Sequence, residues 1–215
     1  MEQGILEQMC EVGRRLHGRN LLAAGDGNIS IRMGDGRIAM TPAGAAKAWL
    51  TPSDMSFLHG DGTVLSGNPS SERLMHLAVY QVCPEAQCVI HAHPPTAIAW
   101  TVARPELHEL PADAIPEVIL AAGRIPVVPY ARPGTLALGE GVRPYLPQHR
   151  LLLLSRHGAL CWGESLEEAY KGMERLEHVA QILKAAVELG GIASLPETEV
   201  LALRAVRERI GPRIL

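Results

Sequence analysis

The sequence has no run of about eighteen consecutive apolar residues, the length that a membrane-spanning helix requires. Its first ten residues mix charged and apolar side chains at helical spacing, and they lack the basic, apolar and small-residue order of a signal peptide. Both absences argue against a membrane protein and against an exported one. We therefore expect a cytoplasmic protein with no membrane partner.

Cysteine pairs at redox or metal-binding spacing are also missing. The four cysteines, Cys10, Cys83, Cys88 and Cys161, form no CxxC motif. A chain of 215 residues buries enough apolar surface to fold without a disulfide scaffold. We expect four buried free thiols.

An excess of positive charge is the third feature that the chain lacks. The formal net charge is -3, and the lysines and arginines are scattered, so the sequence offers no electrostatic footprint for nucleic acid. A hydrophobic fraction of 47% with 20% charged residues is ordinary for a soluble globular protein. The length fits one domain over residues 1–215, without internal repeats or low-complexity segments.

Hydrophobic periodicity predicts interleaved helices and strands. Helices are expected over residues 3–17, 71–82, 134–145 and 165–189, and after the Pro94-Pro95 pair. Strands are expected over residues 29–32, 37–41, 88–92, 151–154 and 159–162. Because tight turns join several of these strands, we predict an α/β sandwich with a mixed or largely antiparallel sheet.

Two of the helices carry start signals. Ser70 or Ser71 is expected to be the N-cap of the helix over 71–82, with Glu72 in its first turn, where the helix dipole favours negative charge. Ser165 and Glu168 have the spacing of a capping box for the last predicted helix.

Three histidines and one glutamate have the pattern of a catalytic metal site. His91 and His93 alternate along a predicted strand, so both side chains point to the same side and can chelate one ion. His157 lies at the end of a leucine-rich strand, where side chains converge without crowding the core. Three imidazoles with Glu72 form a ligand set that suits zinc and leaves room for substrate. Cobalt or manganese would also bind such a set.

The remaining histidines give weaker signals. His76 lies one turn after Glu72 among apolar neighbours, and we expect it to pack near the site rather than bind metal. Surface or capping positions are expected for His17, His59, His108, His149 and His178.

An anion site is predicted beside the metal ligands. Ser70 and Ser71, directly before a helix, offer hydroxyls and free backbone N–H groups to a phosphate. More donors would come from two further segments if the fold gathers them, Gly27-Asn28 and Thr41-Pro42-Ala43-Gly44.

The order of these motifs along the sequence resembles that of the class II aldolase/adducin family, and within it that of the fuculose-phosphate aldolases. The resemblance rests on the segments Gly27–Ser30, Thr41–Gly44, Ser70–Glu72, His91–His93, Pro129–Thr135 and His157-Gly158, which span nearly the whole chain. It implies a three-layer α/β/α sandwich and a homotetramer with active sites between subunits. It also implies one Zn²⁺ per subunit, held by His91, His93 and His157.

The resemblance further implies the roles of the other residues. Glu72 would be the acid/base and an additional zinc ligand when no substrate is bound. The substrate phosphate would be held by Gly27, Asn28, Thr41, Gly44, Ser70 and Ser71. Alignment with the fuculose-phosphate pattern places Glu117 where that group has a tyrosine from a neighbouring subunit, so Glu117 is a candidate general acid.

The expected activity is an aldolase that cleaves a ketose 1-phosphate reversibly to dihydroxyacetone phosphate and an aldehyde. Substrates of this kind include fuculose 1-phosphate and 5-deoxy or 5-methylthio pentulose 1-phosphates. The alternatives on the same metal are a sugar-phosphate 4-epimerase, a dehydratase and a decarboxylase. A non-enzymatic adducin-type module with structural zinc is a further alternative, although non-catalytic adducin heads lack the metal histidines.

Overall fold

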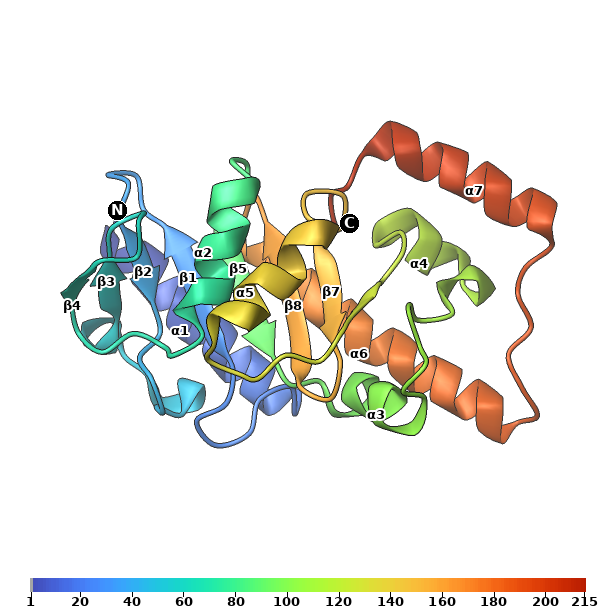
Figure 1. The fold of residues 1–215 in the computed structure, drawn as a ribbon, viewed down its shortest axis with the longest axis horizontal. Coiled ribbons are helices and arrows are strands. Elements are labelled where there is room, and N and C mark those ends of the chain that lie inside the picture. Colours follow the sequence, from blue (N-terminus) through green and yellow to red (C-terminus); the bar gives the residue numbers. More distant parts are fainter. Residues whose placement is uncertain (1) are drawn as a thin grey trace.

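An eight-stranded sheet runs through the centre of the computed structural model, which describes residues 2–215 (Figure 1). The strands are β1 (Asn28–Arg32), β2 (Ile38–Met40), β3 (Ser56–Leu58), β4 (Val64–Ser66), β5 (Cys88–Ala92), β6 (Val127–Val128), β7 (Leu151–Leu154) and β8 (Gly158–Gly163). Their order is β4-β3-β2-β1-β5-β8-β7-β6. Only β6 and β7 pair in parallel among these neighbours. The predicted mixed, largely antiparallel sheet is confirmed.

Helices cover both faces of this sheet. They are α1 (Glu2–Gly18), α2 (Arg73–Val82), α3 (Pro95–Ala103), α4 (Pro116–Ala121), α5 (Leu136–Val142), α6 (Leu166–Glu188) and α7 (Glu197–Ile210). In Figure 1, α2 and α5 lie in front of the sheet, and α1 and α6 lie behind it. The fold is therefore a three-layer α/β/α sandwich.

Alternation along the central strands builds two separate cores. On β5, Ile90 points to the core shared with α1 and α6, whereas Val89 points to the core shared with α2 and α5. Because each face of the sheet is apolar, β5, β7 and β8 are buried along their whole length. The four cysteines are free and buried, as expected.

The start of α2 differs from the prediction. Neither Ser70 nor Ser71 is its N-cap, because the helix begins at Arg73 and Glu72 is the capping residue, without a side-chain capping bond. A turn in which the Arg73 N–H donates to the Ser70 carbonyl oxygen at 3.2 Å delays the helix. Glu72 therefore lies outside the helical ladder, and its side chain is available for other contacts.

The predicted capping box of α6 forms only in half. Ser165 caps the helix and accepts a hydrogen bond from the Glu168 N–H at 3.1 Å. The Glu168 carboxylate instead accepts from the Glu164 N–H and from Arg150 Nη1, both at 2.8 Å. It also accepts from the Ile214 N–H at 2.9 Å, which fixes the end of the chain against α6.

Helices α4 and α7 were not expected, and they pack on each other at one end of the sandwich (Figure 1). Arg204 of α7 donates two hydrogen bonds of 2.8 Å to the Asp113 carboxylate, just before α4. None of the helices between residues 2 and 215 is long and apolar enough to cross a membrane.

Candidate active site

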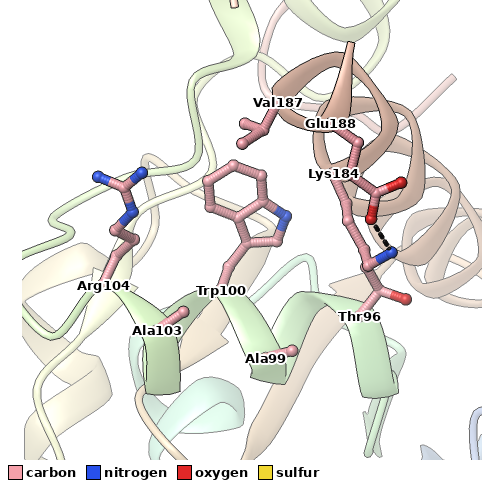
Figure 2. A pocket seen from close by; sticks show the side chains of 8 residues that line it. All are labelled: Thr96, Ala99, Trp100, Ala103, Arg104, Lys184, Val187 and Glu188. Atoms are coloured by element: carbon pink, nitrogen blue, oxygen red, sulfur yellow. Dashed lines mark hydrogen bonds and ion pairs between the residues drawn. The ribbon is translucent and has the colours of Figure 1, made fainter. Parts of the chain in front are cut away.

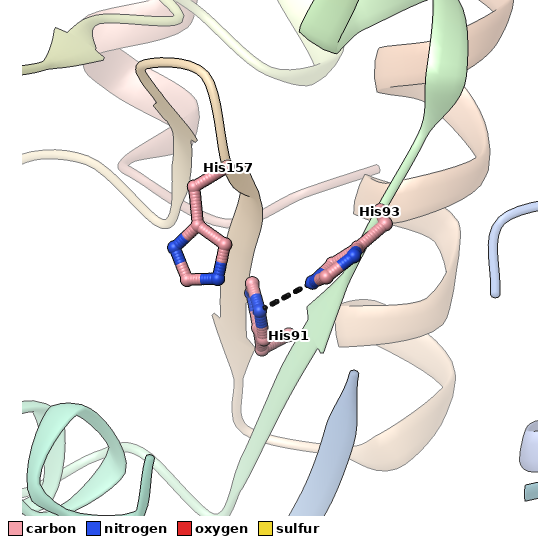
Figure 3. Close-up of side chains that lie close together, drawn as sticks. All are labelled: His91, His93 and His157. Carbon is pink, nitrogen blue, oxygen red and sulfur yellow. Dashed lines mark hydrogen bonds between the residues drawn. The ribbon is translucent and has the colours of Figure 1, made fainter. Parts of the chain in front are cut away.

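The three predicted histidines meet at one end of β5 and β8 (Figure 3). His91 lies on β5, His93 lies just past its end, and His157 lies in the turn between β7 and β8. Antiparallel pairing of β5 with β8 brings that turn beside the two β5 histidines. The Nε2 atoms of His91 and His93 are 3.0 Å apart, and the candidate ligand atoms of all three residues lie within 4.8 Å of one another.

Hydrogen bonds and burial keep lone pairs on the facing nitrogens. The Nδ1–H of His91 donates to the Ala159 carbonyl oxygen at 2.8 Å, which leaves Nε2 as the unprotonated atom. Burial and the neighbouring His91 and His157 lower the pKa of His93 to about 4, so its ring is neutral near pH 7. Neutral imidazoles whose lone pairs converge repel one another unless a cation lies between them.

Glu72 closes this group of ligands. Its Oε2 lies 3.2 Å from His91 Nε2, and its Oε1 lies 3.1 Å from His157 Nε2. Burial raises the pKa of Glu72, whereas protons on the Nε2 atoms of His157 and His91, in place of a metal ion, would hold that pKa well below its usual range. Oε1 is buried and has no other polar partner. Three imidazole nitrogens and a carboxylate oxygen around one point fit a divalent cation, and they suit a transition metal best.

A cavity of about 340 Å³ opens onto these ligands. It is lined by Gly25, Asp26, Gly27, Asn28, Ala43, Gly44, Lys47, Ser70, Ser71, Glu72, His93, Pro133 and His157. The fold thus gathers the predicted anion-binding segments around the predicted metal ligands, as the separate sequence motifs could not show. His91 and Thr41 are fully buried beneath the cavity and do not line it.

Two of the predicted phosphate-binding residues have other contacts in this structure. The Asn28 amide Nδ2 donates to Glu72 Oε2 at 3.0 Å. The Thr41 hydroxyl accepts from the Ile29 N–H at 3.0 Å, so it ties β1 to the loop that follows β2. Phosphate binding by these two side chains stays a prediction.

Gly27 is required for a steric reason. It has a φ of +67°, and a Cβ there would lie 2.7 Å from the His91 carbonyl oxygen. A side chain at this position would therefore displace β5 at His91, one of the three candidate metal ligands.

Glu117, the candidate general acid, is not among the residues that line the cavity. It is exposed in the first turn of α4, at the far end of the sandwich. Glu117 therefore does not contribute to this chain's own cavity in the observed arrangement, and its role as a general acid stays a prediction.

Lys47 is a residue that the sequence analysis missed. It is only 2% exposed, it lines the cavity, and its ammonium donates to the Gly25 carbonyl oxygen at 2.6 Å. Burial lowers the pKa of Lys47, while Asp26 and Glu72 act in the opposite direction. A lysine in an alanine-rich stretch carries no sequence signal for this position.

A second cavity, of about 300 Å³, lies between α3 and α6 (Figure 2). Trp100 and Val187 supply its apolar wall, and Lys184 pairs with Glu188 beside them. None of the three clustered histidines lines this second cavity.

Comparisons with known proteins identify the family. Residues 7–183 match the family model described as Class II Aldolase and Adducin N-terminal domain. A 3-oxo-tetronate 4-phosphate decarboxylase of Escherichia coli is 33% identical over 85% of this chain and 87% of its own length. A methylthioribulose-1-phosphate dehydratase of Methylococcus capsulatus is 33% identical, over 80% of this chain and 89% of its own length. An L-fuculose phosphate aldolase of Methanocaldococcus jannaschii is 29% identical, over 82% and 93%.

A solved structure gives the same result for the fold. The crystal structure of Escherichia coli YgbL, described as an aldolase/epimerase/decarboxylase, superposes with a TM-score of 0.88 at 31% identity. The superposition covers 94% of this chain and 99% of that one. The chain belongs to the class II aldolase and adducin family.

Proposed function

We propose that this chain is a metal-dependent decarboxylase that acts on a 3-oxo sugar-acid phosphate of the 3-oxo-tetronate 4-phosphate type. The support is the 33% identity to a decarboxylase of that substrate over most of both chains, together with a three-histidine and glutamate centre that opens onto a cavity. This proposal takes an alternative of the sequence analysis in place of the aldolase expected there.

The chemistry of the substrate suits the site. A 3-oxo-tetronate 4-phosphate carries its carboxylate one carbon away from the ketone, so loss of CO₂ leaves the electron pair on C2 as an enediolate. A bound divalent cation would act as a Lewis acid towards the substrate oxygens. Protonation at C2 then gives dihydroxyacetone phosphate, and the balance is one substrate and one proton to CO₂ and that product.

Glu72 is the group that we assign to the proton transfer. It is buried at the bottom of the cavity beside the three histidines, where its carboxylate could take up a proton from solvent and deliver it to the enediolate carbon. Asp26, the other carboxylate that lines the cavity, faces His93 Nδ1 at 3.5 Å and would orient that ligand.

The phosphate would bind in the same cavity. We assign it to Gly44, Ser70 and Ser71, with Gly27, Asn28 and Thr41 as the supporting residues implied by the family resemblance. Lys47 would add a positive charge, since it is the only cationic residue among those that line the cavity. A buried ammonium whose only hydrogen-bond acceptor is a carbonyl oxygen is suited to an incoming dianion.

The aldolase is the second candidate, because both reactions pass through the enediolate of dihydroxyacetone phosphate. A retro-aldol cleavage also needs a base for the hydroxyl of the departing aldehyde half, whereas CO₂ leaves without one. This chain's own cavity offers no carboxylate for that task beyond Glu72 and Asp26. A homotetramer in which Glu117 enters a neighbour's site would supply one, and we retain that assembly as a proposal.

The test is product analysis with zinc-loaded protein. A 3-oxo-tetronate 4-phosphate should release CO₂ and dihydroxyacetone phosphate faster than the enzyme-free control, which is needed because β-keto acids also lose CO₂ spontaneously. Ketose 1-phosphates that release dihydroxyacetone phosphate and an aldehyde with higher kcat/KM would make the protein an aldolase. Elimination of water from a methylthiopentulose phosphate would make it a dehydratase.

A variant separates these enzymatic functions from an adducin-type module. Glu72→Gln should retain zinc but lose at least about 100-fold in kcat, the usual contribution of a general acid. Equal zinc content and equal turnover in the variant and the parent chain would contradict the role assigned to Glu72.

A further inference from the structure

A buried chain of hydrogen bonds links Tyr80 to Glu72 through three side chains. The Tyr80 hydroxyl lies 2.8 Å from Ser30 Oγ, which lies 2.7 Å from His76 Nδ1. His76 Nε2 lies 2.5 Å from Asn28 Oδ1, and Asn28 Nδ2 lies 3.0 Å from Glu72 Oε2. All five residues are at most 9% exposed. Three of these residues, Ser30, His76 and Tyr80, have no role in the mechanism given above.

Two regular elements bring these side chains together. Asn28 and Ser30 alternate on β1 and therefore point to the same face of the sheet. His76 and Tyr80 are four residues apart on α2, and they lie one above the other on the helix face that covers this part of the sheet. The contact between β1 and α2 is thus polar in a layer that is otherwise apolar.

The hydrogen-bond donors between Tyr80 and Glu72 can point in only one direction. Asn28 Nδ2 donates to Glu72 Oε2, so the amide oxygen Oδ1, which can only accept, is the atom that faces the ring of His76. His76 must then donate from Nε2 and accept at Nδ1. It follows that the Ser30 hydroxyl donates to His76.

The direction of the last hydrogen bond, between Ser30 and Tyr80, follows from the same reasoning. Because Ser30 uses its proton on His76, its oxygen accepts from the Tyr80 hydroxyl. Each donor therefore points towards Glu72. Burial lowers the pKa of His76 to about 3 with His91 acting in the same direction, so the ring carries a single proton, as this arrangement requires.

We propose that His76, Ser30 and Tyr80 are positioning residues that lock the Asn28 amide with its NH₂ group on Glu72 Oε2. With that oxygen held, Oε1 is the one left to face His157. Without the chain, Asn28 can rotate its amide and present an oxygen to the carboxylate, which would repel Glu72 from its place. Such indirect contacts change activity or metal affinity by about 10- to 100-fold in metal sites.

The tautomer of His76 is the direct test, and it does not depend on the proposed reaction. The full-length zinc-loaded chain, labelled with ¹⁵N-histidine, should show His76 neutral, protonated at Nε2 and unprotonated at Nδ1. The His76→Gln variant identifies the signal by its disappearance. A His76 ring protonated at Nδ1, or one that exchanges between tautomers, would overturn the proposal.

Kinetics test the positioning role itself. Ser30→Ala leaves nothing to donate to His76 Nδ1, and we expect kcat to fall about 10- to 100-fold while KM and zinc content stay unchanged. Tyr80→Phe keeps the Ser30 donor, so its loss should be smaller. Tyr145→Phe is the matched control, because its hydroxyl makes only a 3.4 Å contact with the Val127 carbonyl oxygen away from the site.

These experiments distinguish an incorrect positioning role from an incorrect assignment of the reaction. Wild-type kcat in a folded Ser30→Ala variant would contradict the positioning role, as would a loss of activity that zinc loss fully explains. If the parent chain decarboxylates nothing, the same comparison is made with the reaction that it does catalyse, and the tautomer result is unaffected.

Discussion

Replacing Gly158 with alanine should break the metal site without removing any ligand. Gly158 follows His157 and begins β8. A Cβ at this position would lie 2.5 Å from the Ala92 carbonyl oxygen, 2.8 Å from His91 Cε1 and 2.9 Å from His93 Cδ2. Ordinary van der Waals contact begins near 3.4 Å, so the backbone of β5 and two rings would have to move by up to about 1 Å.

That displacement is large compared with the tolerance of a metal site. Metal–ligand distances normally stay within about 0.2 Å of their ideal values, so a shift several times greater affects two ligands at once. We expect zinc affinity to fall by about 100-fold or more. Overpacking should also cost about 1–3 kcal/mol of unfolding free energy. For a chain of this size, each kcal/mol corresponds to a Tm decrease of roughly 2–4 °C.

The assay combines zinc competition against a chromophoric chelator with thermal unfolding in the presence and absence of zinc. Gly4→Ala is the matched control, because a Cβ there meets nothing within 4 Å in α1 and should be neutral or slightly stabilising. The steric reasoning is refuted if Gly158→Ala binds zinc like the parent chain and unfolds at the same temperature.

Three further variants probe the cavity and its supports. Lys47→Met should raise the KM of the phosphorylated substrate by roughly 10- to 150-fold, because a charged hydrogen bond contributes about 1.5–3 kcal/mol. The control variant Lys184→Met should leave KM unchanged. Equal KM values for the two variants would count against an anion as the partner of Lys47. Glu177→Ala should lower the unfolding free energy by about 1–3 kcal/mol in urea titrations, because the carboxylate accepts N–H groups in the first turn of α3; an unchanged midpoint would disprove this. The unfolded state binds the proton of His76 between its ordinary pKa of about 6.5 and the folded value of about 3, so stability falls as pH falls through that window. The slope should be at most about 1.4 kcal/mol per pH unit, and His76→Asn should flatten it; parallel curves would refute the assignment.

The elements that the sequence predicted best are those with strong local periodicity. The helix over residues 3–17 buries Leu6, Met9, Val12 and Leu16 on one face, as its spacing indicates. Tertiary contacts decided the elements that were missed. Only Val200 is buried on α7, so no apolar stripe marked that helix, and it is held by its packing on α4.

The start of α2 shows how a local signal can mislead. Ser70 and Ser71 have the composition of N-caps, and the sequence therefore placed the helix too early. In the structure, Ser70 forms a turn with Arg73, and Glu72 lies beside His91 and His157. The helix start therefore depends on contacts of Glu72 with His91 and His157, which are distant in the sequence.

The site was predictable to the extent that its chemistry is local. Alternation within five consecutive residues predicts that His91 and His93 point to the same side, and the leucine run before His157 predicts that this histidine lies at a strand end. The positions of Lys47 and of the partners of His76 could not be predicted from local sequence. Only the packing of β1, α2 and the loop after β2 brings these residues together.

The way in which strands β5 and β8 bring the ligands together also determines when the ion can act during folding. His93 and His157 are separated by a long segment that contains α3, α4, β6, α5 and β7, and bringing the ends of this segment together is entropically costly. An unfolded chain can offer an ion the neighbouring pair His91 and His93, whereas the full set exists only once β5 and β8 have paired. Zinc should therefore slow unfolding strongly and accelerate folding little, so that the metal prolongs the lifetime of the native state.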